Sequence, residues 1–297
     1  MTKRKKQKLI KGILTVVCLA ILALIWYVIN PMLKETYEVP DGMAEIHFID
    51  VGQGDATLIM TGGKNILVDT GEYYAKDALT SYLDAKGVTE LEYFVVTHFD
   101  SDHFSNAVTV LEKYDVKKLL IPNQTKNTKT FEKFMDKVEE QMESGDIEVL
   151  NANEMIGQKL ALGDMELTVL APLRDNYDSN DFSIVLMARY GNKRVLLTGD
   201  AEKEAEEDIV GRYTEAELDC DVYKLGHHGS KTSSSQALLD LATPEYVVAS
   251  CGVDNEYNHP HAETLERVKA CTLYRTDTQG SIVLTIANDE ITFTTEK

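Results

Sequence analysis

The chain has 297 residues, of which 43% are hydrophobic and 27% charged. These proportions are typical of a folded protein with a sizeable core, and they exclude a disordered, collagen-like or coiled-coil chain. Lys and Arg number 30 against 49 Asp and Glu, for a net charge of −19. Residues 1–11 hold six of the basic residues, so the rest has 24 basic against 49 acidic residues, a net charge of −25. Such an acidic surface repels polyanions, and a nucleic-acid partner needs a local positive feature such as a metal ion.

An uncharged run at residues 12–29 follows the basic tail. As a helix it is just long enough to cross a bilayer core of about 30 Å. A cleaved signal peptide is the main rival, but the run is long for one and no small-residue cleavage pattern follows it. We therefore expect a single-pass cell-membrane protein, with a cytoplasmic tail at 1–11, a transmembrane signal anchor at 12–30, a stalk at 31–42 and an extracellular domain at 43–297.

Short apolar runs alternate with amphipathic segments from residue 43 onward. The first half predicts strands over 44–50, 55–60 and 65–69, a helix over 74–86, a strand over 93–97, a helix from about 103, a strand over 118–122 and a helix over 127–145. The second half predicts strands over 165–170, 183–189 and 193–198, a helix over 201–212, a strand over 221–225, a helix over 233–242, a strand over 245–250, a helix over 261–270 and two closing strands. Consecutive strands with interspersed helices indicate sheets packed on each other, with helices outside.

Six of the seven histidines lie in three short clusters at predicted strand ends. The first cluster is THFDSDH at residues 97–103, directly after an apolar strand. A lone histidine is commonly a core or surface residue, but four ligand-type side chains within six residues are poorly explained in that way. A turn lets His98 and Asp100 point one way and Asp102 and His103 another, which suits two adjacent metal ions.

Further motifs place acidic or histidine side chains at the ends of predicted strands. They are VDTG at 68–71 with Asp69, VLLTGD at 195–200 with Asp200, GHHGS at 226–230 with His227 and His228, and HPH at 259–261. Gly-Asp is also common turn chemistry, and His261 can equally cap the helix that follows. Imidazole and carboxylate ligands suit zinc, manganese or iron. The chain has no lysine-bearing phosphate loop and no GxGxxG motif, so no nucleotide cofactor is expected.

Together these motifs resemble the signature of the metallo-β-lactamase superfamily, which is HxHxDH after a strand, preceded by an Asp and followed by Gly-Asp and Gly-His. More narrowly, FIDVGQGDA at 48–56, GHHGSKTS at 226–233 and the segment 255–261 resemble the hydrolase domain of ComEC-type competence proteins. The resemblance covers about residues 43–295. It implies an α/β (α+β) fold, the four-layer αββα sandwich, with metals at one edge of the paired sheets.

The resemblance implies two metal sites that share one aspartate. The implied ligands are His98, Asp100, Asp102, His103, Asp200 and His227. His228 can replace His227, since the sequence does not show which ring points inward. Two departures stand out: Asp100 occupies the place of a second His, and no His lies between His103 and His227. The site with Asp100 is therefore poor in nitrogen ligands, which makes Mn²⁺ as plausible as Zn²⁺ for the two divalent ions.

The reaction that the resemblance implies is hydrolysis in which two cations lower the pKa of a water. The expected catalytic residues are Asp102 and His259, and His259 would contact a phosphate or protonate a leaving group. Asp69 would orient the histidines through hydrogen bonds. Behind the ligands or against the substrate we expect Asp69, Asn180, Asp181, His228, Ser230, Lys231 and His261.

The leading hypothesis is a membrane-anchored phosphodiesterase or nuclease. The net charge opposes tight binding of a polyanion, but the metal ions together with Lys224, Lys231 and Arg194 can supply a small positive site. One alternative is hydrolysis of another extracellular substrate, such as a wall-polymer phosphodiester, a lactone or a lactam. The other is a metal-binding module that recognises a protein partner without turnover.

Overall fold

The structure is a computed structural model, and it describes residue 4, residues 15–22, residue 26 and residues 37–297. Glu38–Lys297 form one compact unit. None of the helices in these described parts is long and apolar enough to cross a membrane. The expected location as a single-pass membrane protein with an extracellular domain is therefore corrected. Most of the expected anchor at 12–30, and of the tail and stalk beside it, lies outside the described residues.

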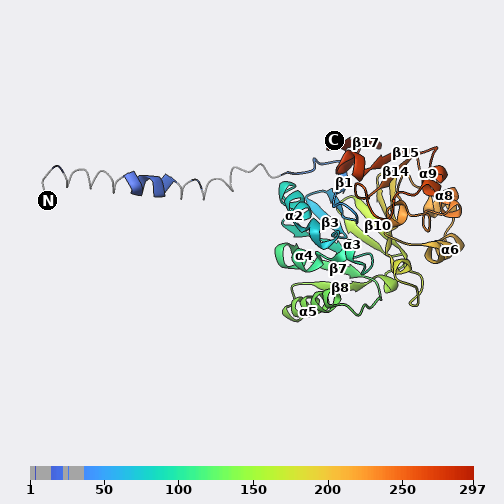
Figure 1. Ribbon diagram of the computed structural model, residues 1–297, viewed down its shortest axis with the longest axis horizontal. Coiled ribbons are helices and arrows are strands. Elements are labelled where there is room, and N and C mark those ends of the chain that lie inside the picture. The colour runs from blue at the N-terminus through green and yellow to red at the C-terminus, as the bar shows by residue number, and fades with distance from the viewer. Residues whose placement is uncertain (1–3, 5–14, 23–25, 27–36) are drawn as a thin grey trace. The chain divides into compact units, whose positions relative to one another are not determined.

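Two sheets form the centre of the domain (Figure 1). The first has eight strands in the order β17-β16-β1-β2-β3-β5-β7-β8. Their bounds are β1 (Met43–Phe48), β2 (Thr57–Thr61), β3 (Lys64–Val68), β5 (Tyr93–Val95), β7 (Lys118–Ile121), β8 (Glu148–Asn151), β16 (Ile282–Ala287) and β17 (Glu290–Thr295). β1, β2 and β3 form an antiparallel meander, whereas β3, β5, β7 and β8 run parallel.

The second sheet has seven strands in the order β15-β14-β13-β12-β11-β10-β9. Their bounds are β9 (Lys159–Leu162), β10 (Met165–Ala171), β11 (Val185–Tyr190), β12 (Lys193–Leu197), β13 (Val222–Lys224), β14 (Tyr246–Ala249) and β15 (Thr272–Arg275). The last four of these strands run parallel. Two short strands, β4 (Glu90–Leu91) and β6 (Asp115–Val116), pair with each other apart from both sheets.

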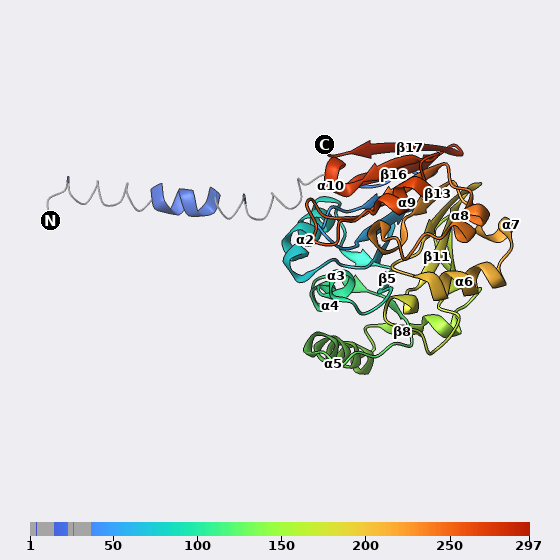
Figure 2. The same ribbon diagram turned by 45° about the vertical axis from the view of Figure 1, so that its right-hand side comes forward.

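Helices cover the outer faces of the two sheets, so the predicted αββα sandwich is confirmed. Figure 2 shows α2 (Lys76–Ala85), α4 (Ala107–Lys113) and α5 (Lys129–Ser144) on one side and α6 (Lys203–Arg212) and α8 (Gln236–Ala242) on the other. The shorter helices are α3 (Ser101–Phe104), α7 (Glu215–Leu218), α9 (Ala262–Arg267), α10 (Thr276–Gln279), and the 3₁₀ turns η1 (Tyr73–Ala75), η2 (Ala152–Glu154), η3 (Asn180–Phe182) and η4 (Gly226–Gly229).

The main core lies between the two sheets, where alternate strand residues face each other. Phe48 and Ile66 from the first sheet and Leu186 and Val195 from the second are fully buried in it. Period-2 alternation puts these side chains on the inner faces, and burying them supplies the main favourable free energy of folding. The core thereby holds the two sheets, and the loops at their edges, in a fixed relation.

Most predicted elements occur in the predicted order, with shifted ends. The strand expected over 55–60 begins at Thr57, because the backbone N–H of Asp55 bonds to Asp102 O (3.1 Å) instead of joining the sheet. The helix expected over 233–242 begins at Gln236, because Ser235 caps it. Strands β4, β6, β8 and β9 were not predicted, and three strands, β15 to β17, follow α9 where two were expected.

Candidate metal centre

Strands from both sheets end at one edge, and the side chains that follow them converge there. β3 and β5 of the first sheet run parallel, as do β12 and β13 of the second. Asp69 follows β3, residues 97–103 follow β5, Asp200 follows β12 and η4 follows β13. Parallel strands bring their carboxyl ends to the same edge, where ligands bind in α/β sheets. The topology therefore gathers motifs that are far apart in the sequence.

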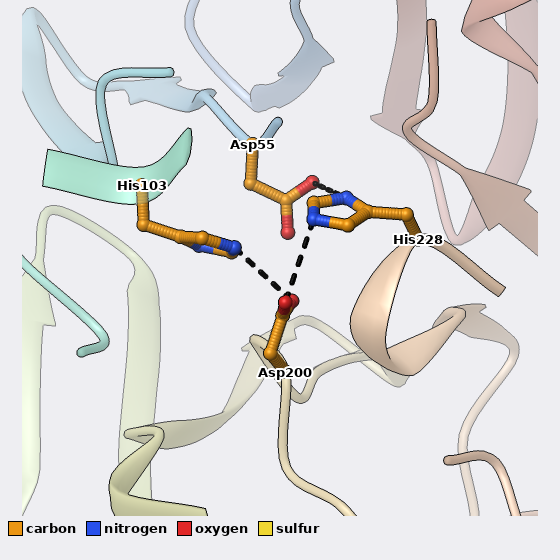
Figure 3. Close-up of side chains that lie close together, drawn as sticks. All are labelled: Asp55, His103, Asp200 and His228. Carbon is orange, nitrogen blue, oxygen red and sulfur yellow. Dashed lines mark ion pairs between the residues drawn. The ribbon is translucent and has the colours of Figure 1, made fainter. Parts of the chain in front are cut away.

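Four buried side chains meet at this edge: Asp55, His103, Asp200 and His228, hereafter the His–Asp cluster (Figure 3). Each offers a ligand atom, and these atoms lie within 4.8 Å of one another. His103 Nε2 lies 3.2 Å from Asp200 Oδ1, and His228 Nε2 lies 3.4 Å from Asp200 Oδ2. Two of the side chains come from the first sheet and two from the second. Such a set of nitrogen and oxygen atoms suits a divalent transition metal.

Asp55 is already neutralised by a buried lysine. Its Oδ2 forms an ion pair with Lys224 Nζ, and both side chains are 3% exposed. Although burial alone favours the protonated carboxyl, Lys224 and His228 lower the pKa of Asp55 to about 2. Asp102 is the better fourth ligand, because its Oδ2 lies 3.0 Å from His228 Nε2 without a lysine on it. We therefore count Asp102, His103, Asp200 and His228 as the residues that fit a metal ion.

Unpaired polar atoms support a cation here. His98 Nε2, His103 Nε2 and Asp200 Oδ1 are buried without a hydrogen-bond partner. Buried polar atoms in native proteins are nearly always satisfied, so a concentration of exceptions indicates a bound partner such as a cation. Two imidazole nitrogens and a carboxylate oxygen are acceptors, and a divalent cation satisfies acceptors. His103 Nε2 and Asp200 Oδ1 therefore fit one divalent ion, where the sequence analysis expected two.

Asp69 lies behind His103 and fixes its ring. Its Oδ2 contacts His103 Nδ1 at 2.8 Å, and its Oδ1 accepts from the backbone N–H of Thr97 at 2.8 Å. The hydroxyl of Thr97 donates to Oδ2 at 2.7 Å. With Nδ1 as the donor to Asp69, the lone pair of His103 lies on Nε2, toward Asp200. Contacts of this kind orient a metal ligand and raise its basicity.

Two consecutive left-handed residues turn the chain after β13 and place two imidazoles beside Asp200, with Nε2–Oδ2 distances of 3.6 Å for His227 and 3.4 Å for His228. His227 has a φ of 48° and His228 a φ of 56°. His228 is fully buried, and its Nδ1 bonds to Ser250 O at 2.9 Å. The side chain of His227 is 24% exposed, and its Nδ1 lies 2.8 Å from Glu202 Oε1. The sequence analysis favoured His227 as the ligand; this geometry leads us to propose His228 instead.

His98 and Asp100 lie on the other side of Asp200. His98 is fully buried, with Nδ1 3.3 Å from Ser183 Oγ and Nε2 3.9 Å from Asp100 Oδ2. Burial and the neighbouring His103 lower the pKa of His98 to about 4, so the ring is neutral. Asp100 Oδ1 accepts from Lys126 Nζ at 2.5 Å. His98 and Asp100 therefore lie next to the cluster without being part of it.

Two cavities adjoin the cluster, with volumes of about 190 Å³ and 460 Å³. Gln53, Asp102 and Tyr257 line both of them. His259 lines the smaller one, is 6% exposed and stacks on the ring of Tyr257 at 5.6 Å. Burial, together with His228 and His227, lowers the pKa of His259 to about 4. Among the described residues, no lysine or arginine lines either cavity.

Asn180 and Asp181 have different surroundings. Asn180 lines the smaller cavity, and its Nδ2 lies 3.4 Å from Glu202 Oε1. Asp181 points to the start of α6, where its Oδ1 accepts from the backbone N–H groups of Glu202 (2.8 Å) and Ala205 (3.1 Å). Asp181 thus satisfies free donors at a helix start and positions the segment after Asp200.

Ser230, Lys231 and His261 line neither cavity. Ser230 Oγ bonds to Thr232 Oγ1 at 2.8 Å, and His261 Nδ1 accepts from the backbone N–H of Lys231 at 3.1 Å. His261 occupies the N-cap position of α9 without a side-chain capping bond. These contacts hold two loops together beside the centre.

The three basic residues expected to form a positive site do not gather. Lys224 is buried against Asp55, Lys231 is exposed, and Arg194 donates to Ala216 O at 2.9 Å in a different cavity. Sequence reasoning missed Lys126, which lies next to Asp100 instead. No signal in the sequence marks it, because it comes from the loop between β7 and α5 and reaches the site only through the fold.

The profile of the metallo-beta-lactamase superfamily matches residues 49–253, and the chain belongs to this superfamily. ComE operon protein 3 of Bacillus subtilis (strain 168) is 30% identical over 270 residues, which cover 84% of this chain and 34% of that protein. Competence protein ComA of Neisseria gonorrhoeae is 34% identical over 249 residues, which cover 82% and 32% respectively. The chain therefore spans about a third of the length of these relatives. The predicted resemblance to this superfamily and to competence proteins is confirmed.

Solved structures agree on the fold. The metallo-beta-lactamase fold protein YhfI from Bacillus subtilis superposes with a TM-score of 0.52 at 12% identity, covering 81% of this chain and 99% of that one. Igni18, a metallo hydrolase from Ignicoccus hospitalis, gives a TM-score of 0.52 at 17% identity and covers 80% and 98%. At these identities the likeness concerns the fold alone.

Proposed function

We propose that this domain is a metal-dependent phosphodiesterase that cleaves nucleic acid. Membership of the superfamily supports a metal-dependent hydrolase. Relatives named Competence protein ComA and Recombination protein 2 support a nucleic-acid substrate. The observation that carries the proposal is the His–Asp cluster, whose buried and unpaired ligand atoms lie beside a cavity.

Asp102, His103, Asp200 and His228 would hold the metal, and Zn²⁺ and Mn²⁺ both suit this mixture of nitrogen and oxygen. A divalent ion there supplies positive charge that lowers the pKa of a water and stabilises charge developing on a phosphate. Asp69 and Ser250 keep the rings of His103 and His228 in the orientation that presents their Nε2 atoms. The two imidazole ligands are thus oriented before any ion binds, which reduces the entropic cost of binding.

His259 is the proposed contact to the substrate. Its low pKa keeps the ring neutral at pH 7, and Gln53 Nε2 lies 3.5 Å from Nδ1. With Gln53 as the donor to Nδ1, the ring's own proton lies on Nε2. A neutral imidazole in this state donates a hydrogen bond to a phosphate or leaving-group oxygen without adding charge. Asp102 would act at the reacting water, which agrees with its place in both cavities.

The larger cavity offers a place for the rest of the substrate. Tyr74 and Tyr257 line it and are 57% and 60% exposed, so their rings are available to a base. Base stacking on aromatic side chains contributes about 1–3 kcal/mol per base in single-strand binding. The phosphate backbone would have to remain near the metal, because the cavity wall carries no basic residue among those described.

The carboxylates that line the larger cavity favour a second candidate function, with a different substrate. Glu72, Asp254 and Glu256 also line the larger cavity. Carboxylates beside exposed tyrosine rings suit an uncharged or cationic group better than a phosphate. The second candidate is therefore a phosphodiesterase for a smaller substrate that carries such a group.

Hydrolysis assays separate these proposals. Protein purified without chelator is tested on bis-p-nitrophenyl phosphate and on single- and double-stranded DNA, with added Mn²⁺ or Zn²⁺. Cleavage of the small diester and of DNA supports the nuclease; cleavage of the diester alone moves the assignment to the second candidate. Asp102→Ala should abolish turnover, while Asp136→Ala, on the exposed face of α5, should not. Bound metal without cleavage of any phosphodiester would refute the proposal and leave a lactonase, a lactamase or a binding module.

A further inference from the structure

Next to Asp100 lies the ammonium group of Lys126, a cation that belongs to the protein itself. Lys126 Nζ donates to Asp100 Oδ1 at 2.5 Å and also contacts Ser179 Oγ. Ser179 Oγ donates in turn to Asp100 Oδ1 at 2.7 Å. The side chains of Lys126 and Asp100 are 24% and 34% exposed, so the pair lies partly sheltered at the site. Asp100 Oδ1, which the sequence analysis expected to bind a metal ion, therefore accepts hydrogen bonds from two donors.

The loop that carries Lys126 is fixed on both sides. Gln124, 6% exposed, accepts from the backbone N–H of Phe99 at 2.8 Å through Oε1. Its Nε2 donates to Ser179 O at 2.9 Å. Gln124 thus ties the loop to the turn next to Asp100 and to the segment that holds Ser179. The ammonium is placed by buried hydrogen bonds two residues away, and not by a free surface side chain that happens to lie nearby.

Neither His98 nor Ser183 offers a ligand atom that replaces Asp100 Oδ1. His98 Nε2 lies 3.9 Å from Asp100 Oδ2. Ser183 Oγ accepts from the backbone N–H of Asp200 at 2.9 Å and lies 3.3 Å from His98 Nδ1, so it faces away from His98 Nε2. Within the part of the chain that the structure describes, the group of converging ligand atoms is Asp55, His103, Asp200 and His228. Asp102 lies outside that group but contacts it, since its Oδ2 is 3.0 Å from His228 Nε2, whereas the Asp100 carboxylate carries the Lys126 ammonium.

We infer that this protein holds one divalent ion, among Asp102, His103, Asp200 and His228, and that Lys126 takes the place of a second. An ammonium on Asp100 neutralises the carboxylate and repels a divalent cation that would share it. It also supplies a point charge that can bind a phosphate oxygen. The inference rests on the proposed metal dependence, but it does not depend on which phosphodiester is cleaved.

The test is the number of ions bound per chain. The full chain, purified without chelator, is equilibrated with Mn²⁺, freed of excess ion and analysed by mass spectrometry for metal, and its electron paramagnetic resonance spectrum is recorded. Wild type should bind one Mn²⁺ with the spectrum of an isolated ion. Lys126→Met removes the charge but keeps the length, and it should bind two, with the splitting of a spin-coupled pair. Lys129→Met, an exposed lysine at the start of α5, should behave like wild type.

A second variant covers the possibility that Lys126→Met fails to fold. Asp100→Ala should still bind one ion, because Asp100 is not a ligand of the occupied site, whereas His228→Ala should lose it. Two ions in wild type, one in a folded Lys126→Met variant, or loss of the ion in Asp100→Ala would each overturn the inference. No ion in any protein would overturn the metal centre and with it the proposed function. One ion without phosphodiester cleavage would refute the function alone.

Discussion

Glu206 should make the stability of this domain depend on pH, and glutamine at this position should remove that dependence. Glu206 is 1% exposed on α6, and its two oxygens accept from the backbone N–H groups of Ser234 (2.6 Å) and Ser235 (2.8 Å). Ser234 Oγ accepts from the backbone N–H of Gly226 at 3.1 Å. The carboxyl thus supports the loop that follows His228.

The size of the change in the free energy of unfolding follows from the pKa of Glu206. Burial raises the pKa of Glu206 from 4.5 to about 7, although the two backbone donors oppose this. Because the folded state binds the proton more tightly, this group stabilises the fold fully below pH 4.5 and loses that contribution as the pH rises through 7. A pKa difference of this size corresponds to a loss of about 3 kcal/mol in the free energy of unfolding.

Urea unfolding of metal-free protein at several pH values between 4.5 and 8 measures the effect. Glu206→Gln cannot titrate, so the stability of wild type relative to this variant should fall by about 3 kcal/mol across the range. A change in stability caused by the glutamine amide itself does not depend on pH, so it does not affect how this difference varies with pH. Glu207→Gln, at an exposed position beside it, should follow wild type at every pH. A difference between wild type and Glu206→Gln that stays constant with pH would refute the reasoning.

Four further outcomes are expected. Asp69→Asn removes the acceptor for His103 Nδ1, so metal affinity, measured by titration, should fall about 10–100-fold, and unchanged affinity would contradict the contact. Lys224→Met leaves Asp55 buried without its partner and should lower the free energy of unfolding by about 3–5 kcal/mol in urea; a loss below 1 kcal/mol would mean that the pair is unimportant. A chelator should lower the melting temperature of metal-loaded protein, since an ion at 1,000 times its Kd stabilises by about 4 kcal/mol, and an unchanged melting temperature would argue against ligands from both sheets. Tyr257→Ala should lower kcat/KM for single-stranded DNA by about tenfold while changing a small diester less, and equal losses would exclude stacking.

The sequence predicted the sandwich fold and the residues that we propose for the centre because its signals were local. Residues 97–103 carry four ligand-type side chains within one turn, and the apolar strand before them indicates where that turn must lie. Asp69 and Asp200 likewise follow short apolar runs, and parallel strands bring such ends to one edge. For these residues, the order of strands and turns in the sequence was enough to predict that they lie at one edge of the sheets.

The sequence did not predict features that depend on backbone conformation or on distant loops. Non-glycine residues seldom adopt positive φ, so nothing in GHHGS shows that both histidines do. That conformation buries His228 and leaves His227 partly exposed beside Glu202. Lys126 and Asp55 enter the site through contacts with residues far along the chain. The expected membrane anchor depended on the length of an uncharged run and the basic tail before it, and the helices of the described residues do not support it.

The pairing of strands in the first sheet also determines when that sheet can finish folding during synthesis. β1, which leads into the loop of Asp55, pairs along its whole length with β16, from Met43–Ala287 to Phe48–Ile282. β16 follows the proposed ligands in the chain and therefore leaves the ribosome after them. Until then one side of β1 has no partner strand, and an unpaired edge is a site of mispairing. A nascent chain therefore carries all the proposed ligands before it can complete the sheet next to them, and loss of β16 and β17 should leave β1 without a partner on that side.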